Sequence, residues 1–290
     1  MKDESPSRTA AWVAAARQMA QLLPPEAQLV SDPYGAAFSY PRLRARIDRL
    51  RPLAGTRMFK QWILYMQVRT RVIDDALRAW VAGGGRQLVL LGAGYDTRAL
   101  RLPELADVDV FEVDHPATQR HKQGVLAQLA VESPSRYVTW DFETRAMDDL
   151  PDVLEEAGLV RGRPVFTIWE GVTMYLTDAA IDASLRAIRA WSPAGSRLAM
   201  TYFTKSRIEQ PTLATRALKA IVATFGEPWR FGWVPDQLPE YLHARGFHLE
   251  QDIALADAAR ELLPPAYASL VAREDRHFSL AAPEAIGLVR

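Results

Sequence analysis

Apolar positions along the chain follow two patterns, and the change between them falls near residue 84. Before it, apolar side chains recur at helical spacing in residues 7–23 and 56–82. Beyond the glycines at 83–85, short apolar runs alternate with helical patterns. Strand, helix, strand with short links predicts a mainly parallel sheet with right-handed crossovers. We therefore expect an α/β, Rossmann-like fold with helices on both faces of the sheet and a helical N-terminal extension.

The predicted sheet has seven strands, each a short apolar run bounded by turn residues. They are residues 87–91, 108–113, 137–140, 164–169, 197–203, 247–250 and 277–281. One helical pattern begins near residue 96, and a second follows residues 114–116 and runs to about residue 130. Further helical patterns cover residues 147–157, 179–191, 213–225 and 235–245.

The whole chain, residues 1–290, is expected to form a single domain with three parts. Residues 1–83 form a helical cap, and residues 84–205 with 235–290 form the core. Residues 206–234 interrupt the alternation and carry three closely spaced aromatic residues, Trp229, Phe231 and Trp233. This segment is predicted either to be a substrate lid or to be a loop packed on the core, and both interpretations stay open.

Composition and charge narrow the class of protein. The formal net charge is zero, with 35 basic and 35 acidic residues, which argues against a nucleic-acid partner. The chain has no cysteine, so disulfides, cysteine zinc sites and thiol catalysis are excluded, and no metal site is predicted. The N-terminus lacks the apolar core of a secretory signal, and no apolar run reaches membrane-spanning length. We expect a cytoplasmic protein with no membrane partner.

The first predicted strand ends in a glycine turn, with Gly92 and Gly94 followed by Asp96. A buried strand, a glycine turn and a helix start are typical of nucleotide sites in open α/β sheets. A P-loop would need Gly-Lys-Ser/Thr, which is absent, and a dinucleotide fingerprint would need glycine where Thr97 stands. The turn alone therefore does not identify its ligand.

The next three strands end in acidic residues, which point to a ligand without a pyrophosphate. Asp114 can accept hydrogen bonds from ribose hydroxyls, and Asp141 can accept the adenine amine while Phe142 packs on the ring. Glu170 lies near the switch in strand order and suits an ammonium group. The combination favours S-adenosylmethionine over NAD. The simpler alternatives are helix caps at Asp96 and Asp114 and a loop role for Asp141.

Several segments in this order resemble the leucine carboxyl methyltransferase-like family of S-adenosylmethionine-dependent methyltransferases, including its bacterial small-molecule members. They are LLGAGYDTRALRL (90–102), FEVDHP (111–116), WDFE (140–143), WEGVTMYL (169–176), SRTAAWVAAAR with SDPYGAAF, VRTRVIDD (68–75) and GEPWRFGW (226–233). The resemblance implies that Gly92 and Gly94 lie under the methionine portion of the cofactor and that Glu170 takes its ammonium group. It also implies that Arg17 and Arg69 hold the methionine carboxylate.

The predicted reaction is methyl transfer to a carboxylate or hydroxyl oxygen of a small-molecule acceptor. Tyr175, just past Glu170, is the candidate for orienting the acceptor. The predicted substrate residues are Tyr202, Phe203, Trp229, Phe231 and Trp233. Alternatives are a protein C-terminal carboxyl methyltransferase, a non-catalytic protein of the same fold and an NAD-dependent oxidoreductase. A homodimer is left open.

Overall fold

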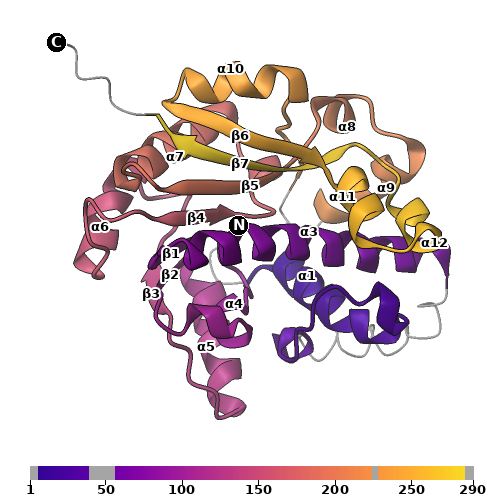
Figure 1. Ribbon diagram of the computed structural model, residues 1–290, viewed down its shortest axis with the longest axis horizontal. Coiled ribbons are helices and arrows are strands. Elements are labelled where there is room, and N and C mark those ends of the chain that lie inside the picture. The colour runs from indigo at the N-terminus through magenta and orange to yellow at the C-terminus, as the bar shows by residue number, and fades with distance from the viewer. Residues whose placement is uncertain (1–5, 39–55, 224–227, 285–290) are drawn as a thin grey trace.

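The structure, a computed structural model, describes residues 6–38, 56–223 and 228–284. A seven-stranded sheet lies at its centre with helices packed on both faces (Figure 1). The strand order is β3-β2-β1-β4-β5-β7-β6. Strands β1 to β5 are parallel, and β7 lies antiparallel between β5 and β6. The predicted fold class, including the helical N-terminal extension, is confirmed.

The strands follow the predicted apolar runs closely. They are β1 (Gln87–Leu91), β2 (Asp109–Asp114), β3 (Arg136–Thr139), β4 (Phe166–Trp169), β5 (Arg197–Phe203), β6 (Phe247–Ala254) and β7 (Arg276–Pro283). The main difference is β6, which continues past its predicted end at residue 250. It does so through a register shift between Leu249 and Gln251 that the alternation of side chains does not reveal.

Within the described residues, α-helices pack on the sheet and form the N-terminal extension (Figure 1). They are α1 (Arg8–Met19), α3 (Arg57–Ala82), α4 (Arg98–Arg101), α5 (Pro116–Gln128), α6 (Leu150–Glu156), α7 (Asp178–Trp191), α8 (Lys205–Glu209), α9 (Leu213–Ala223), α10 (Leu238–His243), α11 (Leu255–Leu262) and α12 (Pro265–Ala268). No helix within the described ranges has the length and apolar character that crossing a membrane requires.

Three helical predictions need correction. The first helix ends at Met19, and a 3₁₀ turn carries the chain to Leu22 before Pro24, which cannot continue a helix. The helix expected from Asp96 is only the single turn α4, because Pro103 follows. Helices α11 and α12 were not predicted. The described part of GEPWRFGW begins at Pro228, so Gly226 and Glu227 lie outside the described residues, as do residues 39–55 of the predicted cap.

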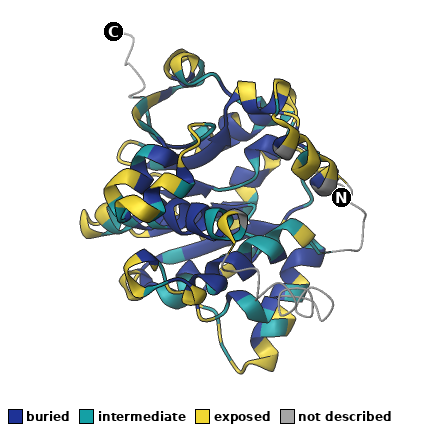
Figure 2. Ribbon diagram, turned by 90° about the vertical axis from the view of Figure 1, so that its right-hand side faces the viewer, coloured by how far each residue is buried: buried dark blue, intermediate teal, exposed yellow. Residues whose placement is uncertain are grey.

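Alternate residues of each central strand bury their side chains in two separate cores. Leu88 and Leu90 of β1 pack in the core beneath α1, α3 and α11, whereas Val89 and Leu91 pack in the core beneath α6, α7 and α10. Figure 2 shows the strands dark blue between helices whose outer surfaces are exposed. A sheet buried on both faces explains why these strands read as continuous apolar runs rather than alternating ones.

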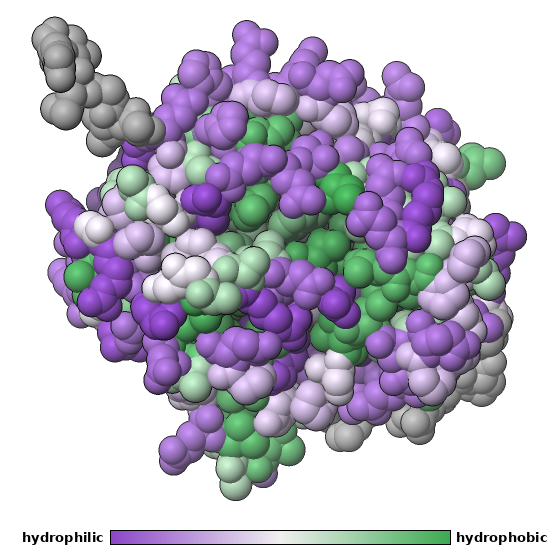
Figure 3. Space-filling model, viewed as in Figure 1, coloured by the Kyte–Doolittle hydropathy of each residue, from purple (hydrophilic) through white to green (hydrophobic). Residues whose placement is uncertain are grey.

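A groove of about 530 Å³ lies on the α3 face of the sheet, between α3 and α11. Figure 3 shows apolar side chains gathered in the middle of this face. Phe166 and Arg197, which line the groove, are the first residues of β4 and β5. The groove therefore lies toward the edge of the sheet where the parallel strands begin, away from the acidic residues at their ends.

The strand order reverses between β1 and β4, which are neighbours in the sheet but not in the chain. The connections after these two strands leave toward opposite faces, so their carboxyl ends open a crevice there. In open α/β sheets ligands bind in such a crevice. The fold thus brings the glycine turn after β1 beside Glu170, the residue after β4.

Candidate functional site

The turn after β1 has a backbone that only glycine adopts readily. Gly92 and Gly94 have φ values of 73° and 53°. A Cβ at Gly92 would lie 2.6 Å from Cγ2 of Val172, and one at Gly94 would lie 3.1 Å from Cβ of Ala10. The amides of Gly92 and Ala93 both donate to the carbonyl of Val113 at the end of β2. The turn therefore has a fixed shape that brings bare backbone to the crevice.

Asp114, the last residue of β2, is fixed by two backbone amides. Gly94 donates to its Oδ2 at 2.6 Å and His115 donates to its Oδ1 at 2.7 Å. Burial nevertheless raises the pKa of Asp114 from 3.8 to about 6, because the two amides only partly offset the lost hydration. His115, rather than Asp114, caps α5 through a bond from the amide of Ala117 to its Nδ1. Asp114 is thus an oriented carboxylate that further hydrogen-bond donors would stabilise.

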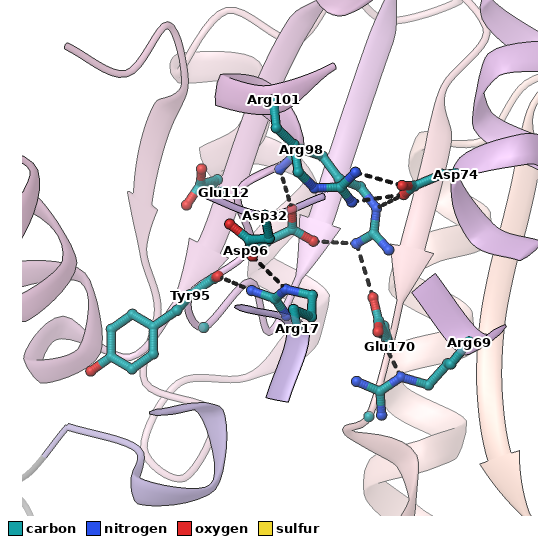
Figure 4. Close-up of polar contacts among 12 residues, drawn as sticks. Arg17, Asp32, Arg69, Asp74, Tyr95, Asp96, Arg98, Arg101, Glu112 and Glu170 are labelled. Carbon is teal, nitrogen blue, oxygen red and sulfur yellow. Dashed lines mark hydrogen bonds and ion pairs between the residues drawn. The ribbon is translucent and has the colours of Figure 1, made fainter. Parts of the chain in front are cut away.

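The N-terminal helices cover the glycine turn through Arg17 of α1. Its Nε lies 2.8 Å from Oδ2 of Asp32, and a second nitrogen donates to the carbonyl of Tyr95 at 2.5 Å. Asp32 is completely buried and also accepts the amides of Tyr34 and Gly35. Arg17 thereby links the predicted SDPYGAAF turn to the residue that follows the glycine turn (Figure 4).

Glu170, at the end of β4, lies between two arginines. Nε of Arg69 is 2.7 Å from its Oε1, and a terminal nitrogen of Arg98 is 2.9 Å from its Oε2. Burial would raise the pKa of Glu170, but Arg69 and Arg98 hold it below its ordinary value, so the group is ionised. The contact with Arg69 does not have hydrogen-bond geometry, although both atoms are buried. The predicted cofactor residues Arg69 and Glu170 therefore lie together and neutralise each other.

Arg98 is the centre of a polar network that the sequence interpretation did not include. Besides Glu170 it contacts Asp96 and Asp74, and Asp74 also accepts two hydrogen bonds from Arg101 (Figure 4). Burial works to raise the pKa of Asp96, but Arg98 and other nearby cations hold it at about 2. The signal was present in the sequence, since Asp74 belongs to VRTRVIDD and Arg98 with Arg101 to LLGAGYDTRALRL.

Asp141 and Phe142 follow β3 at the same edge of the sheet. Asp141 accepts the amide of Glu143 at 3.0 Å, which lowers its pKa, and it is partly exposed. Phe142 is half-buried against the core beneath α6 and α7. Strand β3 neighbours β2 on the side away from β4, so both residues lie beside Asp114 at the end of β2. A base attached to a ribose that contacts Asp114 would extend in this direction.

The segment around Trp229 is bonded to the 3₁₀ turn Thr173–Tyr175 after β4 and to the end of β5. The amide of Arg230 donates to the carbonyl of Met174 at 2.7 Å, and the amide of Trp233 donates to that of Phe203 at 3.2 Å. The ring of Trp229 packs edge-on against Phe203 at 4.8 Å, in a small apolar cluster that Tyr175 borders. Phe203, Trp229 and Tyr175 therefore lie together at the β5 side of the crevice.

The other predicted substrate residues lie elsewhere. Tyr202 points to the opposite face from Phe203, because neighbouring strand residues alternate, and its hydroxyl donates to Asp252 at 2.9 Å. Phe231 and Trp233 are buried in the core beneath α7 and α10, with ring centres 4.7 Å apart. All three side chains pack as core residues. For Phe231 and Trp233, this agrees with the loop interpretation of residues 206–234 more than with a mobile lid.

The fold and the site together define the class as a methyltransferase-like α/β protein. Two solved structures share the fold: a provisionally named methyltransferase from Thermobifida fusca (TM-score 0.61, 19% identity, covering 97% of this chain and 96% of that one) and a DUF574 family protein from Streptomyces avermitilis (TM-score 0.62, 17% identity, covering 94% and 97%). At these identities the likeness concerns the fold.

The sequence comparisons identify the family. The model of the leucine carboxyl methyltransferase family matches residues 10–189. Relatives from Mycobacteroides abscessus (37% identity, 66% of this chain and 62% of theirs) and Frankia alni (33%, 68% and 70%) are provisionally named S-adenosyl-L-methionine-dependent methyltransferases. The chain thus spans about two thirds of the length of these relatives. It belongs to the leucine carboxyl methyltransferase family, which confirms the resemblance seen in the sequence.

Proposed function

We propose that this methyltransferase transfers a methyl group to a carboxylate or hydroxyl oxygen of a small molecule. The relatives' names confirm the expected cofactor class, S-adenosylmethionine, and the oxidoreductase alternative finds no support in the family match. The observation that carries the proposal is the convergence of the glycine turn, Asp114 and Glu170 at one edge of the sheet. The same edge continues into an aromatic wall at β5.

The residues at this edge fit such a cofactor. When bound, S-adenosylmethionine supplies an electrophilic methyl group on a positively charged sulfur. The glycine turn would lie under its methionine portion, Asp114 would accept its ribose hydroxyls, and Asp141 with Phe142 would contact its adenine. Asp114 suits this role because its buried carboxylate, with a pKa near 6, gains stability from added hydroxyl donors.

The pairing of Arg69 with Glu170 also fits an amino-acid group. A buried ion pair that loses one partner leaves an uncompensated charge, which is strongly destabilising. The amino-acid group of the cofactor is a zwitterion and carries both a positive and a negative charge. Its carboxylate can pair with Arg69 in place of Glu170, and its ammonium group can pair with Glu170 in place of Arg69. The exchange is made easier because the Arg69–Glu170 contact lacks a well-directed hydrogen bond. Arg17, near the glycine turn, would add positive charge toward the same carboxylate.

The acceptor side supports a small substrate. Trp229 is held by backbone bonds of its segment to Met174 and Phe203, so the wall beside Tyr175 is rigid and apolar. Such a wall excludes water, which favours a displacement in which the positive charge of sulfur and the negative charge of oxygen disappear together. Tyr175 would donate or accept one hydrogen bond that aligns the acceptor oxygen.

The proposal can be tested with methyl-labelled S-adenosylmethionine and three sets of acceptors: small carboxylic acids, phenols, and a peptide ending in leucine. We expect labelled product from a small acceptor with stoichiometric S-adenosylhomocysteine. Alkali would release the label from an ester and leave an ether intact, which distinguishes the carboxylate from the hydroxyl. Label on the peptide alone would instead establish the protein carboxyl methyltransferase. Cofactor binding without turnover of any acceptor would favour the non-catalytic alternative.

A further inference from the structure

A second group of arginines lies at the carboxyl edge of the sheet, outside the cofactor network. Arg276 is the first residue of β7 and pairs directly with Phe203, the last residue of β5. Directly paired residues point to the same face, and the Arg276 guanidinium lies 4.2 Å from the ring centre of Tyr65 on α3. Arg276 is therefore placed between α3 and the end of β5.

Tyr65 connects this position to the candidate site. It lies one helical turn before Arg69 on α3, and the Arg69 guanidinium is 5.8 Å from the same ring. Arg69 in turn contacts Glu170. Tyr65 thus separates Arg276 from the cofactor network, and Arg276 belongs to the β5 side of the crevice, where Phe203 and Trp229 form the aromatic wall.

Arg276 has poor compensation for its charge among the described residues. Its side chain is 16% exposed, and its ion-pair partner is Asp275, at 3.9 Å, beyond hydrogen-bond distance. Asp275 is already paired with Arg207, whose side chain is only 2% exposed. The Nε atoms of both arginines are buried without a hydrogen-bond partner within the described ranges. Two guanidinium groups therefore share one carboxylate, which leaves an excess positive charge at this place.

The direction of the pKa shift agrees with that imbalance. Burial lowers the pKa of Arg276, and Tyr65 opposes that effect without overcoming it. The positive charge of Arg207 lowers the pKa further, against the smaller opposing effect of Asp275. At Arg69, in contrast, burial also lowers the pKa, but Glu170 and Tyr65 together outweigh it and the pKa is raised. A buried cation without a full partner reduces folding stability. A physical reason for placing Arg276 here is that an anionic group of a ligand completes the pairing.

We propose that Arg276 and Arg207 bind an oxyanion of the methyl acceptor, a carboxylate or a phosphate, that is distinct from the oxygen being methylated. The inference rests on the proposed function. A nucleophilic oxygen loses negative charge during methyl transfer, so two guanidinium groups paired to it would stabilise the ground state more than the transition state. The paired oxyanion is therefore a recognition group, and the acceptor carries a second oxygen that faces the cofactor. Phe203 and Trp229, which lie within 4.7 and 5.1 Å of the Arg207 guanidinium, contact its apolar part.

The first arm of the test measures thermal unfolding without ligand. Arg276→Met removes an incompletely paired cation and keeps a similar stem, so we expect the unfolding temperature to rise. The matched control is Arg197→Met on the same strand pair. Arg197 has a partner, Glu250, at 2.6 Å, so its loss should not raise the unfolding temperature. An Arg276→Met protein less stable than wild type would mean that Arg276 has a structural role, and would overturn the proposal.

The second arm uses benzoate, phenyl phosphate and the uncharged benzamide as probes, each added to protein saturated with S-adenosylhomocysteine. At millimolar concentration, one or both anions should raise the unfolding temperature of wild type and Arg197→Met, while benzamide should not. The effect should disappear in Arg276→Met and return in part in Arg276→Lys. An effect of benzoate would identify the bound group as a carboxylate, and an effect of phenyl phosphate would identify it as a phosphate. Equal effects of benzoate and benzamide, an anion effect that survives in Arg276→Met, or no effect of either anion would overturn the proposal.

Calorimetry with S-adenosylhomocysteine separates the two levels of inference. We expect the same affinity in wild type and Arg276→Met, because Arg276 lies beyond Tyr65 from the cofactor network. Failure of wild type to bind S-adenosylhomocysteine would contradict the proposed function itself. Normal binding with a failed anion arm would contradict only the oxyanion site.

Discussion

The backbone amide of Gly94 donates a hydrogen bond of 2.6 Å to Oδ2 of Asp114, 20 residues further along the chain. The bond joins the turn after β1 to the last residue of β2, so the shape of the turn and the direction of the carboxylate depend on each other. Ordinary loop residues do not constrain each other in this way. A change at either residue should therefore alter cofactor binding without touching the rest of the sheet.

The first prediction concerns the pH dependence of cofactor binding. Burial raises the pKa of Asp114 to about 6, and only its ionised form accepts two ribose hydroxyls. We expect the Kd for S-adenosylhomocysteine to be nearly constant above that pH and to rise by up to about tenfold for each pH unit below it. The rise stops at the pKa of Asp114 in the complex, which the bound hydroxyls lower. Calorimetry across this window measures the effect.

The control for this prediction is Asp114→Asn, which keeps the shape of the side chain but cannot ionise. Its affinity should be weaker at neutral pH and should no longer change through pH 6. Wild-type affinity that does not vary in the same window would show that the ribose does not contact Asp114.

The second prediction concerns the turn itself. Gly92→Ala places a Cβ 2.6 Å from Cγ2 of Val172 on a backbone with φ of 73°. We expect a loss of about 1–3 kcal/mol in the free energy of unfolding, together with weaker cofactor binding. Adding Val172→Ala should relieve the steric part only, because the backbone strain remains. Denaturant unfolding and calorimetry measure the two effects.

Gly124 in α5 provides the matched control. It has no neighbouring atom within 4 Å of an added Cβ, and it lies inside a helix. Gly124→Ala should therefore stabilise the protein by about 0.4–1 kcal/mol. If both alanine variants behaved alike, the conformation of the turn would not be the cause.

Local patterns in the sequence were sufficient for the sheet and for the residues at its carboxyl edge. An apolar run followed by a glycine or an acid marks the end of a buried strand, so Gly92, Asp114 and Glu170 could be placed together from the sequence. The neighbours of Glu170 could not. Arg98 is 72 residues away and Arg69 lies on a helix, where an arginine ordinarily extends into solvent.

Side-chain direction was harder to predict than position. Tyr202 and Phe203 both end β5, but alternation sends them to opposite faces, and only the pairing with β7 shows which one meets α3. The aromatic segment was also ambiguous, because Phe231 and Trp233 have no periodic pattern of their own. The amide of Phe231 donates to the carbonyl of Met174 and that of Trp233 to the carbonyl of Phe203, and no local pattern reveals these distant partners.

The third prediction concerns stability in acid. The folded pKa of Asp96 is about 2, below its ordinary 3.8, so the native state binds fewer protons than the unfolded chain between these values. The resulting stabilisation, about 2 kcal/mol, is fully present above pH 4 and disappears as the pH falls toward 2. We expect Asp96→Asn to lose that amount at neutral pH and to approach wild type as the pH falls. Denaturant unfolding at a series of pH values measures the difference.

Asp152 provides the comparison for this measurement. Its side chain is 80% exposed and its contact with Arg161 is 3.6 Å long. An exposed pair of this kind contributes little, so Asp152→Asn should match wild type at every pH. A constant deficit of Asp96→Asn at all pH values would indicate lost packing instead of lost charge pairing.

The last prediction tests Tyr175 as the residue that orients the acceptor. Tyr175 borders the cluster that contains Phe203 and Trp229, and Tyr175→Phe removes only its hydroxyl. We expect kcat/KM for the acceptor to fall about fivefold, since one hydrogen bond contributes roughly 1 kcal/mol, while the Kd of S-adenosylhomocysteine stays unchanged. Tyr241→Phe is the control, because its hydroxyl bonds Asp182 on the far face of the sheet. Equal kinetics for both variants would leave Tyr175 a packing residue, with alignment supplied by the aromatic wall alone.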